Sequence, residues 1–183
     1  MKHLWYGLGL LAAVAALVAV QVLPKLEQYE LISDTRYPPA ENGRFAGSTW
    51  RLLELRPAQG EGLPDGVKGV TAVIGVTPGD EAASKALGPG CEASVRDAAD
   101  RVWGPSNDVR GEAGLTTLCT RIDEKTYKPI LNRPGAEVKW QASFAVPAGA
   151  VSSLRVEVRL QKTDGFVRLS PTAAPSGGQL PAG

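Results

Sequence analysis

The sequence predicts a mainly β protein, with a single antiparallel β-sandwich behind one N-terminal transmembrane helix. Residues 138–146 and 154–160 alternate apolar and polar side chains, which is the pattern of a strand with one buried face. Glycine and proline occupy 21 and 14 of the 183 positions, and this share favours turns and short strands over long helices. Residues 4–23 carry no charged side chain and form a separate apolar block.

Residues 4–23, LWYGLGLLAAVAALVAVQVL, are expected to cross a membrane as one uncleaved helix. Twenty helical residues measure about 30 Å, the thickness of the hydrocarbon core of a bilayer. The alternative is a cleaved signal peptide, which has a shorter apolar core that ends in a small-x-small site. Because the end of this segment offers only poor cleavage sites, we expect a single-pass anchor in the cell membrane.

The orientation of this anchor follows from the cysteines more than from the flanking charges. Lys2 and the amino terminus precede the segment and Lys25 follows it, so the charge bias is weak. A disulfide between the two cysteines needs an oxidising compartment. We therefore expect the N-terminus in the cytoplasm and the rest of the chain outside it.

One face of the expected helix carries small residues at the spacing i, i+3, i+4 and i+7. Small side chains let two membrane helices approach closely, so this face is a candidate contact with a partner helix. The alternative is a plain tether, because alanine is common in anchors. The candidate residues are Gly9, Ala12, Ala13, Ala16 and Ala19.

The remainder divides into a spacer, one domain and a tail. Residues 24–46 contain Pro38-Pro39, which enforces extended backbone, and are expected to be a juxtamembrane spacer. Residues 47–169 form the expected sandwich domain. Residues 170–183, SPTAAPSGGQLPAG, have little to bury and are expected to be disordered.

Further strands are expected on both sides of the two alternating segments. Only Asp80–Leu87 has a helical period within the expected domain. Seven or eight short strands separated by turns are typical of an antiparallel sandwich. The additional strand candidates are residues 49–56, 70–77, 92–96, 101–103, 115–122 and 166–169.

Four local patterns resemble a known family. They are Trp50-Arg51-Leu52-Leu53, the Val/Ile-rich run Val70 to Val76, Val95-Arg96-Asp97 followed by Trp103, and Trp140 to Pro147 leading into Leu154-Arg155-Val156. In this order they resemble the telokin-like, immunoglobulin-type domains of bacterial surface proteins, the DUF4352-like group. The chain departs from that pattern in one turn, where Ala98-Ala99-Asp100 stands in place of the usual glycine. The resemblance implies an immunoglobulin-like fold and an extracytoplasmic interaction or accessory module, and it transfers no catalytic residue.

Cys91 and Cys119 are the only cysteines, and an even count in an exported domain predicts one disulfide. The alternative is a redox-active pair, but the C-x-x-C spacing typical of that chemistry is absent. We expect a structural bridge.

The composition excludes several classes of function. The single histidine, His3, rules out a Ser/His/Asp triad, a Cys/His dyad and a multi-histidine metal site. The formal net charge of +1 is not that of a nucleic-acid binder. Nucleotide-binding glycine motifs and the alternating carboxylates of a calcium loop are missing. We therefore expect no catalytic residue, metal, cofactor, nucleotide or nucleic acid. The remaining enzymatic alternative is a cell-wall or carbohydrate enzyme, which needs two facing carboxylates whose separation cannot be read from a sequence.

The outward-facing residues of the two alternating segments form a mixed polar set. This set is either an ordinary solvated surface or a face that binds a partner. Its members are Lys139, Gln141, Arg155, Glu157 and Arg159. The sequence thus predicts a membrane-tethered, non-enzymatic binding or accessory domain whose partner is another membrane or cell-surface protein. The alternative is an accessory subunit of a larger membrane complex, held through its transmembrane helix.

Overall fold

The structure is a computed structural model that describes residues 39–40 and 43–170. The expected transmembrane segment with its small-residue face, most of the spacer, and the expected tail beyond residue 170 lie outside the described residues. Within the part that is described, no helix has the length and apolar composition needed to cross a membrane.

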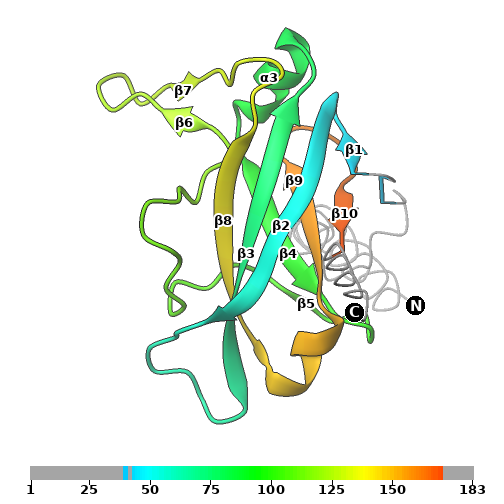
Figure 1. Ribbon diagram of the computed structural model, residues 1–183, viewed down its shortest axis with the longest axis vertical. Coiled ribbons are helices and arrows are strands. Elements are labelled where there is room, and N and C mark those ends of the chain that lie inside the picture. Colours follow the sequence, from blue (N-terminus) through cyan, green and yellow to red (C-terminus); the bar gives the residue numbers. More distant parts are fainter. Residues whose placement is uncertain (1–38, 41–42, 171–183) are drawn as a thin grey trace, which may run out of the picture. The chain divides into compact units, whose positions relative to one another are not determined.

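The described chain is mainly β, with antiparallel sheets and few helices, as the sequence predicts. Three long strands, β2, β3 and β8, make up most of the first sheet, and a short helix follows β3 (Figure 1). The elements are β1 (Arg44–Phe45), β2 (Ser48–Ala58), β3 (Val67–Pro78), α3 (Glu81–Leu87), β4 (Cys91–Arg96), β5 (Val102–Trp103), β6 (Arg121–Ile122), β7 (Pro129–Ile130), β8 (Val138–Pro147), the 3₁₀ helix η1 (Ala148–Ser153), β9 (Arg155–Leu160) and β10 (Val167–Leu169).

The strands form two four-stranded sheets and one separate hairpin. The first sheet has the order β1-β2-β3-β8, and the second has the order β10-β9-β4-β5. All of these pairings are antiparallel. Strands β6 and β7 pair only with each other. Strand β1 precedes residue 47, so the first sheet begins inside the segment expected to be a spacer.

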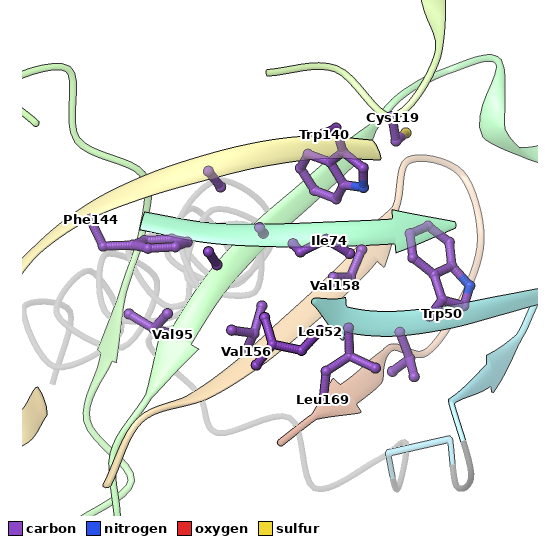
Figure 2. Packing of buried hydrophobic residues seen from close by; sticks show 14 of the residues in the cluster. Trp50, Leu52, Ile74, Val95, Cys119, Trp140, Phe144, Val156, Val158 and Leu169 are labelled. Atoms are coloured by element: carbon purple, nitrogen blue, oxygen red, sulfur yellow. The ribbon is translucent and has the colours of Figure 1, made fainter. Parts of the chain in front are cut away.

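The two sheets enclose one hydrophobic core (Figure 2). The first sheet contributes Trp50, Ile74, Trp140 and Phe144, and the second sheet contributes valines such as Val156, all nearly inaccessible to solvent. Alternate residues of β8 and β9 point into this core, so the alternation in the sequence identifies the buried side of each strand correctly.

The helix α3 forms where the sequence predicts it. Asp80 is the N-cap residue, and its side chain accepts a hydrogen bond of 2.7 Å from the backbone N–H of Ala83. Leu87 is fully buried in the core, which fixes the helix at the end of β3.

The strand expected over residues 115–122 is wrong except at its end, where Arg121–Ile122 forms β6. The backbone carbonyl of Thr116 accepts a hydrogen bond of 2.9 Å from the N–H of Gln141 in β8. A single parallel bridge joins Thr116 to Trp140 at this point. Since the segment touches β8 locally and then leaves it, no continuous ladder forms.

Candidate functional site

A disulfide holds the start of the β6–β7 hairpin against the second sheet. Cys91, the first residue of β4, is bonded to Cys119, and their Cα atoms lie 5.9 Å apart. Cys119 is 1% exposed and belongs to the core cluster. The predicted disulfide is therefore confirmed, and it fixes the chain two residues before β6.

The other end of the hairpin is held by hydrogen bonds to the first end and to α3. The side-chain amide of Asn132 donates a hydrogen bond of 2.9 Å to the carbonyl of Cys119. The hydroxyl of Ser84 in α3 donates to the carbonyl of Asn132. Because Asn132 and Ser84 are both buried, these bonds are shielded from water. Both ends of the hairpin are thus fixed at the α3 end of the two sheets.

The turn between β6 and β7 is ordered by one carboxylate. Asp123 accepts hydrogen bonds from the backbone N–H groups of Lys125 and Thr126, at 3.1 and 2.7 Å, and from the Thr126 hydroxyl at 2.8 Å. These bonds, those from Thr126 first, lower the pKa of Asp123 below its ordinary value. The N–H of Tyr127 donates a hydrogen bond of 2.8 Å to the carbonyl of Asp123. The turn is therefore a defined loop with its carboxylate ionised at neutral pH.

This hairpin carries apolar side chains that face solvent. The structure describes six large hydrophobic side chains as exposed, and five of them lie between residues 118 and 131. They are Leu118 (44% exposed), Ile122 (37%), Tyr127 (82%), Ile130 (39%) and Leu131 (46%). Figure 1 shows the hairpin projecting from the sheets on the side of α3. Exposed apolar side chains that gather in one segment indicate an interaction surface. We call residues 118–133 the apolar hairpin.

The apolar hairpin is also cationic. Its four basic residues against Asp123 and Glu124 give a formal charge of +2, because 4 − 2 = 2. Among the residues that the structure describes, none of these four takes part in an ion pair. The basic residues are Arg121, Lys125, Lys128 and Arg133, and all four are exposed.

The five residues expected to share one polar face do not lie together. Lys139 and Gln141 are on the outer side of β8, in the first sheet. Arg155, Glu157 and Arg159 are on the outer side of β9, in the second sheet. The core separates the two outer sides, so the five residues cannot contact one partner as a single patch.

Gln141 is buried and holds a loop rather than facing solvent. Its side-chain amide donates hydrogen bonds to the carbonyls of Glu112 and Leu115, at 2.7 and 2.9 Å. Its side-chain oxygen accepts a hydrogen bond of 2.6 Å from the N–H of Glu112. The loop covers part of the open edge of β8, which would otherwise present unpaired backbone groups. This position therefore serves the fold.

Glu157 is 1% exposed and forms the centre of a charged cluster. Arg96 donates to its two carboxylate oxygens at 2.8 and 3.2 Å, and Arg168 donates to one of them at 2.9 and 2.7 Å. The guanidinium of Arg159 lies 4.8 Å from the ring centre of Phe166. A carboxylate satisfied by two arginines links β4, β9 and β10, so Glu157 is also a structural residue.

Sequence reasoning missed the apolar hairpin. Apolar residues such as Ile122 and Ile130 predict burial when only composition is considered, and their exposure is set by the tertiary fold. The available signal was the turn pattern Asp-x-x-Thr at residues 123–126, which lies between Ile122 and the apolar run 129–131. Over the described ranges, no group of three or more histidine, cysteine, aspartate or glutamate side chains is placed to hold a metal ion.

Comparisons with protein-family models, with curated proteins and with solved structures found no match.

Proposed function

We propose that this protein is a membrane-tethered binding or accessory domain that acts outside the cytoplasm by contact and not by catalysis. The apolar hairpin is the surface that makes this contact. The single observation that carries the proposal is that exposed apolar side chains gather on one hairpin whose two ends are fixed. A hairpin held in this way presents its side chains without a large entropic cost of ordering on binding.

The strand order supports an immunoglobulin-type fold for this domain. The adjacency β2-β3-β8 corresponds to strands A, B and E of such domains, and β10-β9-β4 corresponds to G, F and C. Strand β5 takes the place of the additional strand C′ beside strand C. This correspondence agrees with the resemblance to the telokin-like domains of bacterial surface proteins, which also implies an interaction or accessory role.

The tether and the compartment rest on two features of the chain. Residues 4–23 have the length and composition of a single-pass anchor. The Cys91–Cys119 disulfide favours an oxidising compartment for the domain. A non-catalytic role agrees with the exposed side chains of the apolar hairpin, which are mostly apolar or cationic.

Photo-crosslinking in intact cells tests this proposal. A photoreactive phenylalanine derivative replaces Tyr127 in the full chain, and the matched control places it at Asp65, an exposed residue of the β2–β3 loop. We expect adducts at position 127 and not at position 65, with either a protein or a lipid as the captured molecule. Absence of adducts at position 127, or equal capture at both positions, would overturn the proposal. A third variant carries the photoreactive residue at Ala12, and adducts that form only in this variant would instead favour a subunit held by its transmembrane helix.

A further inference from the structure

We propose that the apolar hairpin docks on the surface of the membrane and recognises anionic lipid headgroups. This inference rests on the proposed function, because the tether is what brings the domain close to a bilayer. It assigns a ligand class to the hairpin and leaves the two sheets as the support.

The side chains of the hairpin have the chemistry of a membrane interface. Tyr127 at the turn is 82% exposed. Tyrosine is enriched at membrane–water interfaces, because its ring is apolar and its hydroxyl group is polar. Ile122 and Ile130 stand in the paired strands behind it. When a protein segment lies on a membrane surface, its apolar side chains enter the boundary between the headgroups and the acyl chains. A turn that only faces water gains no stability from exposed apolar side chains.

The charge of the hairpin selects anionic lipids over neutral ones. Lys125 and Lys128 flank Tyr127 within the same turn, and Arg121 lies opposite Ile130 in the hairpin ladder. Asp123 is occupied by hydrogen bonds inside the turn, so its carboxylate is directed to the backbone and the Thr126 hydroxyl. Basic residues close to an anionic surface each contribute about 1 kcal/mol, so two lysines supply a factor on the order of 30 in the docked-to-undocked ratio.

Because the domain is tethered to the membrane, a weak contact between the hairpin and lipid is sufficient for docking. Residues 24–38 are 15 residues, which span at most roughly 50 Å when extended. A second contact made by a chain tethered through a linker of this length experiences an effective concentration on the order of millimolar. A hairpin with a few apolar side chains and a formal charge of +2 therefore needs only low intrinsic affinity.

Fluorescence of the full chain reconstituted in vesicles tests the inference. An environment-sensitive dye is attached at Glu124→Cys in the hairpin turn, and the matched control carries it at Asp65→Cys. The vesicles contain phosphatidylcholine alone or an equal mixture of phosphatidylcholine and phosphatidylglycerol. In the anionic vesicles we expect a blue shift and quenching by brominated lipid at position 124, both reduced by added salt, and neither at position 65.

A charge-matched pair of variants separates the hairpin from the net charge. Lys125→Gln with Lys128→Gln should lower the docked-to-undocked ratio on the order of 30-fold. Lys68→Gln with Lys162→Gln removes the same charge from exposed positions outside the hairpin and should leave the ratio unchanged. Equal loss in both variants, or equal shifts in neutral and anionic vesicles, would overturn the inference.

The two proposals fail in different ways. If the dye at position 124 stays in water in both lipids while Tyr127 still crosslinks to a protein in cells, the lipid assignment is wrong and the binding function stands. If position 124 stays in water and position 127 gives no adduct, both proposals are wrong.

Discussion

At the scale of single residues, the exposure of a side chain depends less on its direction from the strand than on which other segments cover it. Lys139 and Gln141 both point away from the core on β8, yet Lys139 is exposed and Gln141 is 3% exposed. The difference arises because residues 112–115 fold over Gln141 and take up its side-chain hydrogen bonds. A position called polar and outward from sequence alone can therefore be a structural one.

Replacing Gln141 by leucine should destabilise the protein and loosen this loop. The change removes three hydrogen bonds and leaves the N–H and carbonyl of Glu112 without that partner, at a cost of about 1–3 kcal/mol. Urea unfolding of the full chain measures the loss, and trypsin cleavage after Arg110 measures loosening of the loop.

Lys139→Leu is the matched control for this change, because it introduces the same side chain on the same side of β8 at an exposed position. It should alter the unfolding free energy by no more than about 0.5 kcal/mol. Equal effects of the two substitutions would mean that the loop does not depend on Gln141.

At the scale of the elements, the sequence predicts strands well where one face is buried and poorly where pairing is local. The alternation in residues 138–146 and 154–160 corresponds to β8 and β9 nearly from end to end. The run at residues 115–122 contains enough apolar residues for a strand, but its place is set by Gln141 and the disulfide. Such long-range partners leave no period in the sequence.

Removing the disulfide should free the hairpin while the two sheets persist. The bridge closes a loop between residues 28 positions apart, and the chain-entropy estimate for such a loop is about 3.5 kcal/mol. We expect Cys91→Ser with Cys119→Ser to lower the unfolding free energy by about that amount. Hydrogen exchange should speed up most at the amide of Asp123, which bonds the carbonyl of Lys128 within the hairpin.

The amides of β3 are the internal control for this experiment. This strand is paired on both sides, with β2 and with β8, in the first sheet, whereas Cys91 belongs to the second sheet. Its exchange should change only as much as global stability does. Exchange that rises equally in β3 and in the hairpin would show that the bridge supports the whole domain and not the hairpin in particular.

At the scale of the whole molecule, the sequence predicts a mainly β chain but not how its polar surfaces are divided. Alternation shows which residues of a strand face inward, and it contains no information about the sheet to which the strand belongs. For that reason Gln141 and Glu157, from two different sheets, are grouped together when only the sequence is read. The exposure of the apolar hairpin is not predicted for a similar reason. Its two strands, β6 and β7, belong to neither four-stranded sheet, and the sequence does not show this.

Because one core joins both sheets, the described domain should unfold as a single unit. Phe144 of β8 is fully buried in this core, and Figure 2 shows its ring on the side of Val95 from the opposite sheet. Phe144→Ala should cost about 3–5 kcal/mol, a large share of the 5–15 kcal/mol that holds a typical domain folded. Val102→Ala, at a 38% exposed position of β5, should cost far less.

Urea unfolding followed by tryptophan fluorescence and by far-UV circular dichroism should give coincident transitions in each variant. Two separate transitions, or equal losses in Phe144→Ala and Val102→Ala, would mean that the sheets do not depend on a shared core.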